Sequence, residues 1–281
     1  MQPKEMAIDD ADPILRLDAA PSSSVKRRLR RGIHLLPSVF TVANLMCGCY
    51  VIRVAVDGNS MEYDYAARAI WIAWMFDALD GALARVTGTT SAFGKQFDSL
   101  ADIVTFGIAP VFLTYVWALR PPPLSASQDR VLAMGVGCVV GLFYVVCCAW
   151  RLARFNLQLL GPRENRYFVG LPTPAAALLV AGVIHYVGRP IQDVGLSWLL
   201  ISLLAILGLL MLSSIRHYSF KRIHWTRRHR STVVILVTLL LAGVVHFSGI
   251  ALLVIAASYV LHGVALQIFR SVRRRRKYGD A

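Results

Sequence analysis

Eight apolar segments, each near the length that a helix needs to cross a bilayer, constrain the fold of this chain more than any other feature. A helix rises about 1.5 Å per residue, so about 20 apolar residues span the hydrocarbon core. Hydrophobic residues make up 56% of the 281 residues, and the mean hydropathy is +0.56. We therefore predict an all-α, polytopic transmembrane helical bundle. Its eight spans are expected at residues 35–56, 65–86, 97–119, 131–152, 170–188, 195–214, 231–247 and 249–269.

The distribution of basic residues predicts the orientation. With eight spans, both termini lie on one side of the membrane, and the stretches on that side hold 25 of the 30 Lys and Arg residues. Cytosolic loops carry such an excess, so both termini are expected in the cytosol, and the expected location is a bacterial inner membrane. The net charge of +14 is then mainly a topology signal. Anionic membrane lipids are expected partners of the basic runs, and nucleic acid is not.

The segments outside the spans and the cysteines add little chemistry. Residues 1–31 lack a secretory signal and are expected to be disordered or to lie on a surface. The five cysteines lie in apolar segments without CxxC spacing. We expect them to be small buried or lipid-facing side chains.

Four aspartates lie at the cytosolic ends of the second and third spans. A carboxylate inside a membrane helix costs about 2.5–3.5 kcal/mol, so four of them need a compensating partner. At 100° per residue, they fall on two stripes that can face one another across a pocket. The first stripe holds Asp77, Asp80, Gly81 and Ala84 with Arg85 at its edge, and the second holds Gly94, Asp98, Ala101, Asp102 and Thr105.

Carboxylates without a nearby His or Cys indicate a hard divalent cation, Mg²⁺ or Mn²⁺. A pair of such ions can hold phosphates and assist a displacement at phosphorus, and Arg85 suits a phosphate oxygen. Two alternatives remain. Intramembrane aspartates also serve proton or ion relays in transporters. A structural salt-bridge cluster is disfavoured because only Arg85 and Lys95 are near enough in sequence to balance four acids.

The stretch from Asp77 to Asp102 resembles the complete signature of the CDP-alcohol phosphatidyltransferases, Asp-x2-Asp-Gly-x2-Ala-Arg-x8-Gly-x3-Asp-x3-Asp. The resemblance implies that the aspartates bind two divalent metal ions and that the last one is the general base toward the acceptor hydroxyl. Gly94 would permit a close helix approach. The implied metal ligands are Asp77, Asp80, Asp98 and Asp102, with Asp102 also the base, and the implied CDP-binding residues are Gly81, Ala84, Arg85 and Gly94.

Other segments resemble the phosphatidylserine synthases of bacteria and archaea. This resemblance implies transfer of a phosphatidyl group from CDP-diacylglycerol to L-serine, giving phosphatidylserine and CMP, in a homodimer. The spacing alone leaves glycerol 3-phosphate, inositol phosphate or choline open as acceptors. Ser38 departs from the Asn expected in the first segment. The segments are LPSVFTVANLMCG (36–48), FDSLADIVTFGIAP (97–110), WRLARFN (150–156), FVGLPTPAAA (168–177) and SSIRHYSFK (213–221).

Three cationic side chains, Arg151, Arg154 and Lys221, are candidates for contacts with the acceptor or with phosphate. Each can instead anchor its helix at the membrane surface, and for Lys221 the anchor is favoured. Small residues in GVGCVVG (135–141) would allow close helix contact between subunits. The expected divisions of the chain are a basic N-terminal segment (1–34), a catalytic transmembrane domain (35–221), and a basic loop with two further spans and a basic tail (222–281).

Overall fold

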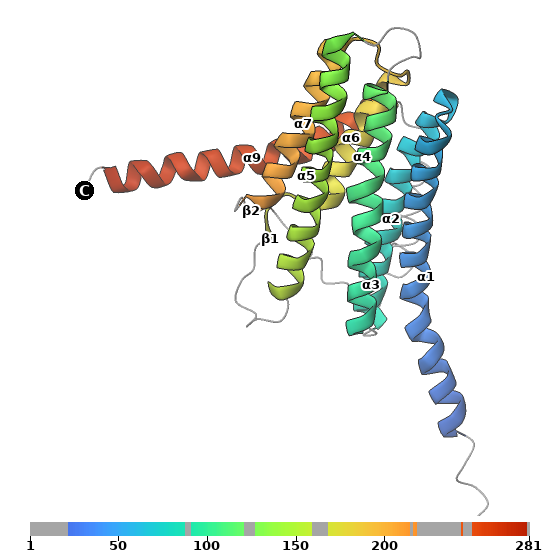
Figure 1. Ribbon diagram of the computed structural model, residues 1–281. Coiled ribbons are helices and arrows are strands. Elements are labelled where there is room, and N and C mark those ends of the chain that lie inside the picture. Colours follow the sequence, from blue (N-terminus) through green and yellow to red (C-terminus); the bar gives the residue numbers. More distant parts are fainter. Residues whose placement is uncertain are drawn as a thin grey trace, which may run out of the picture.

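The computed structural model describes residues 22–87, 91–120, 127–158, 168–213, 216–217, 243 and 249–279, which form a helical bundle (Figure 1). Side chains are described from residue 39 onward, except for residues 85–87, 266–279 and a few single positions. The prediction of an all-α bundle is confirmed. Its helices are α1 (Ser22–Asp57), α2 (Tyr63–Thr87), α5 (Gln128–Gln158), α6 (Thr173–Val187), α7 (Val194–Leu212) and α9 (Gly249–Gly279), with a continuous helical stretch from Ala92 to Leu119.

This continuous stretch alternates between α-helical and π-helical turns. The backbone N–H of Ala109 donates to the carbonyl of Val104, five residues earlier, which is the π pattern. The first π-helical turn begins directly after Asp102, so the residues that follow it are rotated relative to a regular α-helix. The elements are α3 (Ala92–Asp102), η3 (Ile103–Ile108, π-helical), α4 (Ala109–Thr114) and η4 (Tyr115–Leu119, π-helical).

Two short strands join the segment before α6 to the segment after α7. β1 (Phe168–Val169) pairs antiparallel with β2 (Arg216–His217). Next to this pair, Gly170 has a φ of +94°, and a Cβ there would lie 2.3 Å from the carbonyl oxygen of Met211. Glycine is needed at this position because both the backbone conformation and the close approach exclude a side chain.

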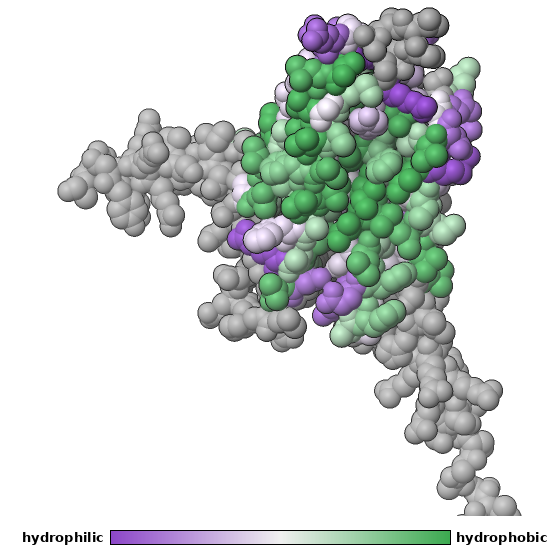
Figure 2. All heavy atoms as spheres, viewed as in Figure 1, coloured by the Kyte–Doolittle hydropathy of each residue, from purple (hydrophilic) through white to green (hydrophobic). Residues whose placement is uncertain are grey.

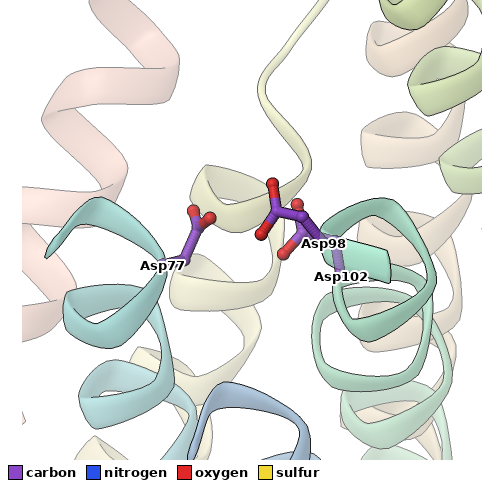
Figure 3. Close-up of side chains that lie close together, drawn as sticks. All are labelled: Asp77, Asp98 and Asp102. Carbon is purple, nitrogen blue, oxygen red and sulfur yellow. The ribbon is translucent and has the colours of Figure 1, made fainter. Parts of the chain in front are cut away.

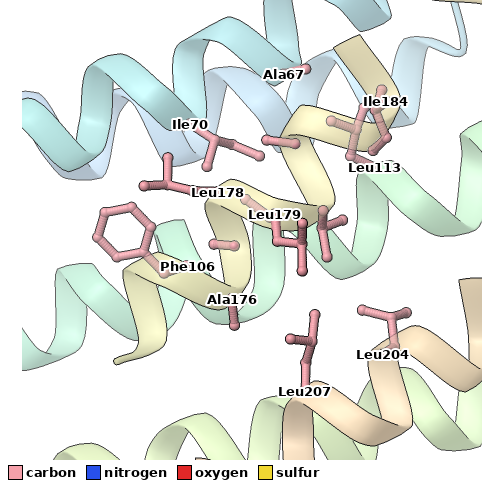
Figure 4. Close-up of a cluster of buried hydrophobic side chains, with 14 of the residues drawn as sticks. Ala67, Ile70, Phe106, Leu113, Ala176, Leu178, Leu179, Ile184, Leu204 and Leu207 are labelled. Carbon is pink, nitrogen blue, oxygen red and sulfur yellow. The ribbon is translucent and has the colours of Figure 1, made fainter. Parts of the chain in front are cut away.

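The short helix α6 occupies the interior of the bundle and contacts α2, α4, η3, α7 and α9. Its small residues allow this crowding, since a Cβ at Gly182 would lie 3.1 Å from the Cα of Leu253 in α9. Figure 4 shows Leu178 and Leu179 of α6 among side chains from the neighbouring helices. Because α6 touches so many elements, it fixes how they are placed around the aspartates.

An ionic cluster joins the end of α6 to the start of α2, far along both helices from the aspartates. Asp64 contacts Nδ1 of the buried His185, and Arg68 Nη2 lies 2.9 Å from the other carboxylate oxygen of Asp64. The pairing fixes the longitudinal position of α6 against α2. It also gives each carboxylate oxygen of Asp64 a partner within the protein.

Four helical stretches of the described chain are long and apolar enough to cross a membrane, namely Val39–Asp57, Ala92–Leu119, Gln128–Leu157 and Val194–Leu212. Figure 2 shows hydrophobic residues over the middle of the visible face and hydrophilic residues toward its ends. The protein therefore spans the membrane several times. α2 is long enough to cross, but its aspartates and arginines lower its hydropathy. The apolar helices Thr173–Val187 and Gly249–Gly263 are shorter than about 20 residues.

Some segments predicted from the sequence differ from the structure, and others lie outside the described residues. α1 begins at Ser22, inside the segment expected to be disordered or surface-lying, because its Lys, Arg and Leu residues favour helix. The expected seventh span, 231–247, lies almost entirely outside the described residues, so the count of eight spans and the orientation remain predictions. The five cysteines are free; Cys147 and Cys148 are buried, whereas Cys49 and Cys138 are exposed.

Candidate active site

Three aspartates converge between α2 and α3. Asp77 in α2 faces Asp98 and Asp102 in α3 (Figure 3). One carboxylate oxygen from each lies within 4.8 Å of the others. Asp98 and Asp102 are four residues apart and so share one face of α3. The two stripes predicted from the sequence therefore do face one another at these positions.

Asp80 is placed differently from these three. Its side chain is buried, with 7% of the residue exposed, and its Oδ2 accepts a hydrogen bond from Thr41 Oγ1 of α1. It is not part of the three-carboxylate group. The structure therefore joins Asp80 to α1 and leaves Asp77, Asp98 and Asp102 as the central cluster.

Asp102 is the most enclosed of the three clustered acids. Its Oδ1 accepts a hydrogen bond of 3.2 Å from Asn44 Nδ2 of α1, and 7% of the residue is exposed. Asp77, Asp98 and the guanidinium of Arg151 all interact electrostatically with it. The neutral amide of Asn44 thus holds Asp102, which also interacts with two negative carboxylates and one positive guanidinium.

Arg151, at the end of α5, lies inside the bundle beside this cluster. Only 9% of the residue is exposed, and Nη1 donates a hydrogen bond of 2.8 Å to Thr173 Oγ1 at the start of α6. Its charge interacts with Asp77 and Asp102 and with the hydroxyl of Tyr259 in α9. A buried position of this kind does not fit a surface anchor. Arg154, three residues later, is half-buried.

The remaining predicted residues fall into three groups. Gly81 and Ala84 lie in α2 and are half-buried. Gly94 lies in the first turn of α3, and a Cβ there would meet only Ser91 Oγ within 4 Å among the described residues, so no close helix approach occurs at this glycine. Arg85 belongs to α2, but its side chain lies outside the description, and so does the whole of Lys221.

The clustered carboxylates fit a hard divalent cation. They offer only oxygen donors, which Mg²⁺ and Mn²⁺ prefer. Three carboxylates this close repel one another unless positive charge is supplied. Arg151 supplies one such charge. Asp77, Asp98 and Asp102 could therefore hold a metal ion.

Sequence reasoning missed four polar residues around the cluster. Thr41 and Asn44 of α1 bond to Asp80 and Asp102, while Thr173 and Tyr259 lie next to Arg151. Thr41 and Asn44 lie three residues apart in a mostly apolar part of α1, and this spacing was the available signal. For Tyr259 nothing in the sequence indicated a contact with Arg151.

Comparison with known proteins agrees with this geometry. A model of the CDP-alcohol phosphatidyltransferase family matches residues 34–276. The chain is 31% identical over 247 residues to the CDP-diacylglycerol–serine O-phosphatidyltransferase of Helicobacter pylori strain J99, over 86% of this chain and 94% of that protein. It is 38% identical over 165 residues to the protein of the same name from Mycobacterium tuberculosis strain H37Rv, over 57% and 52% of the two chains.

A third relative comes from an archaeon. The chain is 33% identical over 184 residues to the archaetidylserine synthase of Methanothermobacter thermautotrophicus, over 65% of this chain and 69% of that protein. The family match covers most of the chain and includes both helices that carry the clustered aspartates. The chain belongs to the CDP-alcohol phosphatidyltransferase family.

Proposed function

We propose that this protein transfers a phosphatidyl group from CDP-diacylglycerol to the hydroxyl of L-serine, giving phosphatidylserine and CMP. The observation that carries the chemistry is the cluster of Asp77, Asp98 and Asp102 between two helices of a family member. The choice of serine is supported by the names of the relatives. Two are named for CDP-diacylglycerol and serine, and the archaeal one shares serine in its name.

Four aspartates are the proposed ligands of two divalent metal ions, Mg²⁺ or Mn²⁺, with Asp80 completing the set Asp77, Asp98 and Asp102. When bound, such ions would neutralise the carboxylates, hold the pyrophosphate of the donor and stabilise the charge that develops during transfer. Gly81, Ala84, Arg85 and Gly94 are the proposed CDP-binding residues. Gly81 and Ala84, which follow Asp80 in α2, leave room for a ligand because one has no side chain and the other has a small one.

Asp102 is the proposed general base. One of its carboxylate oxygens takes the proton of the serine hydroxyl, and the hydroxyl oxygen forms a bond to the phosphorus that carries diacylglycerol. The bond from that phosphorus to the bridging oxygen of the pyrophosphate breaks, and CMP leaves with the electron pair. A general base contributes about 10²–10⁴-fold, so charge stabilisation and positioning must supply the rest of the acceleration.

Arg151 is the favoured candidate for a contact with the serine carboxylate or with donor phosphate. Its burial next to Asp77 and Asp102 supports this role, since a guanidinium there meets an anion inside the site. Arg154 and Lys221 are weaker candidates for the same contact. The half-buried position of Arg154 is compatible with a role at the membrane surface.

The cellular setting is also part of the proposal. An active site facing the cytosol of a bacterial inner membrane is supported by the 25 of 30 Lys and Arg residues on that side of the eight-span topology. We also propose that the catalytic domain ends at the boundaries given above, at residues 34 and 221. Membrane lipids are proposed as partners, and the protein is proposed to be a homodimer. For the homodimer, Gly137 and Gly141 are already in contact with Leu119 and Val111 of the same chain. A Cβ at Gly135 would meet no described atom within 4 Å, so this glycine is the one of the three that can lie against a second subunit.

The test compares aspartate variants in purified protein by incorporation of labelled L-serine into lipid. Asp77→Asn and Asp98→Asn should each lower kcat by at least the base contribution of about 10²–10⁴-fold, because each loses a metal ligand. Asp102→Asn should lower kcat as far or further, because it loses a metal ligand and the base. Asp129→Asn, at an exposed position in the first turn of α5, is the matched control and should keep its activity. Near-normal turnover of Asp77→Asn would remove the metal-ligand assignment.

A further inference from the structure

We propose that Thr41 and Asn44 of α1 are positioning residues that hold Asp80 and Asp102 in the geometry required for metal binding and for proton transfer. The inference rests on the proposed function for its chemistry but on independent contacts for its residues. Neither residue belongs to the aspartate signature. Both donate a side-chain hydrogen bond to a signature aspartate.

The contact between Thr41 and Asp80 joins two buried groups. Thr41 is 3% exposed and Asp80 is 7% exposed, and the threonine hydroxyl donates to Asp80 Oδ2. A buried carboxylate needs donors to offset its lost hydration. The bond therefore selects one orientation of the Asp80 carboxylate.

Asn44 holds Asp102 in the same way from one helical turn further along α1. The residue is fully buried, with 0% exposed, and Nδ2 lies 3.2 Å from Asp102 Oδ1. Its own Oδ1 is buried without a hydrogen-bond partner in the described part of the chain. Buried amide oxygens are rarely left without a donor, so the site has capacity for a hydroxyl, ammonium or water that enters with the substrate.

The backbone of α1 is itself fixed against the turn that follows Asp102. Thr105 Oγ1 of η3 donates a hydrogen bond of 3.1 Å to the backbone oxygen of Asn44. Gly48 allows this approach, because a Cβ there would lie 2.5 Å from Thr105 Oγ1. The side chain of Asn44 is thus placed by its backbone, independently of the bond to Asp102.

These contacts give α1 a specific role in the proposed reaction. With Oδ1 of Asp102 bonded to Asn44, the second carboxylate oxygen is the one that accepts the proton of the hydroxyl. Partners of metal-binding carboxylates affect metal affinity or activity by about 10–100-fold when removed. Thr41 should therefore act mainly on metal affinity, and Asn44 mainly on turnover.

The threonine is tested by Mn²⁺ binding, measured by electron paramagnetic resonance without substrate. Thr41→Val keeps the shape and removes the hydroxyl, and it should weaken Mn²⁺ binding by about 10-fold. Thr41→Ser retains the hydroxyl and should bind like the wild type. Thr114→Val is the matched control, since in the described contacts that buried hydroxyl donates to the carbonyl of Pro110 in its own helix and to no aspartate. Unchanged Mn²⁺ affinity in Thr41→Val would overturn the role of Thr41. If Thr41→Val does not fold, the comparison of Thr41→Ala with Thr41→Ser decides in the same way.

The asparagine is tested by separating kcat from KM. Asn44→Ala should lower kcat by about 10-fold or more while the KM for CDP-diacylglycerol changes little. The matched control is Asn156→Ala, whose amide donates to Ser99 Oγ at 2.9 Å and to no aspartate in the described contacts. Normal turnover in Asn44→Ala would contradict the proposal. If the wild type transfers nothing to serine but Thr41→Val still weakens Mn²⁺ binding, the proposed function fails and the positioning of the metal site stands.

Discussion

Arg151 Nη1 donates a hydrogen bond of 2.8 Å to Thr173 Oγ1 and thereby joins the end of α5 to the first residue of α6. The same guanidinium interacts with Asp77 and Asp102. Residues of four helices, α2, α3, α5 and α6, therefore meet at one cation. This arrangement places a group suited to an anionic substrate directly beside the proposed base.

Replacing Arg151 by Lys should weaken binding of L-serine. Lysine keeps the charge but loses the planar set of donors that can bond Thr173 and a carboxylate together. Loss of one charge-assisted hydrogen bond costs about 1.5–3 kcal/mol, so the KM for serine should rise by about 10-fold or more. Arg189→Lys, at an exposed position just after α6, is the control and should change the KM little. An unchanged KM in Arg151→Lys would exclude the carboxylate contact.

Divalent metal should stabilise the folded protein through the aspartates. A ligand that binds only the native state, present at about 100 times its Kd, adds about 2.7 kcal/mol of stability. We expect Mn²⁺ to raise the Tm of the wild type in detergent by several degrees and EDTA to reverse the change. Asp98→Asn should lose this response. An equal Mn²⁺ response in wild type and variant would show that the metal binds elsewhere.

Gly48 and Gly135 should respond in opposite ways to substitution by Ala. A Cβ at Gly48 would lie 2.9 Å from the backbone Cα of Thr105, whereas a Cβ at Gly135 would have no described atom within 4 Å. Gly48→Ala should therefore destabilise the protein by about 1–3 kcal/mol through forced displacement of η3. Gly135→Ala should be neutral or stabilising, since Ala favours helix. Thermal unfolding in detergent distinguishes the two, and equal Tm values would contradict the close contact.

Helical periodicity was sufficient to predict much of the aspartate site. Asp98 and Asp102 are four residues apart, so they share a face in any α-helix, and a short turn between antiparallel helices brings Asp77 opposite them. The contacts of α1 could not be predicted in the same way. Thr41 and Asp80 are 39 residues apart, and Asn44 and Asp102 are 58 apart. These pairs depend on the rotation of α1 about its axis, which a nearly uniform apolar pattern does not define.

The local helix geometry after Asp102 was likewise not predictable. The apolar pattern of residues 97–119 is typical of a regular α-helix, whereas the structure has π-helical turns at η3 and η4. Tight packing provides a physical reason, since a Cβ at Gly107 would lie 3.2 Å from Cys148 Sγ of α5. Such contacts come from residues distant in sequence. The choice of L-serine as acceptor came from the family resemblance, because neither the helical periodicity nor the packing of the helices identifies the acceptor.

The predicted orientation can be tested at two exposed positions. Asn59 lies between α1 and α2, and Lys95 lies in the first turn of α3, at the opposite ends of α2. In a background without the exposed Cys49 and Cys138, Asn59→Cys should react with a membrane-impermeant maleimide in intact bacterial cells. Lys95→Cys should react only after lysis. The reverse pattern would place the aspartates on the outer side of the membrane.

The most direct test of the central claim is CMP release by the purified protein with CDP-diacylglycerol and Mn²⁺ or Mg²⁺. L-serine, glycerol 3-phosphate, inositol phosphate and choline are compared as acceptors, each with and without EDTA. We expect CMP release with L-serine alone and loss of that release in EDTA. Release with another acceptor in place of serine would contradict the proposed substrate. No release with any acceptor, in folded protein that binds Mn²⁺, would contradict the proposed reaction.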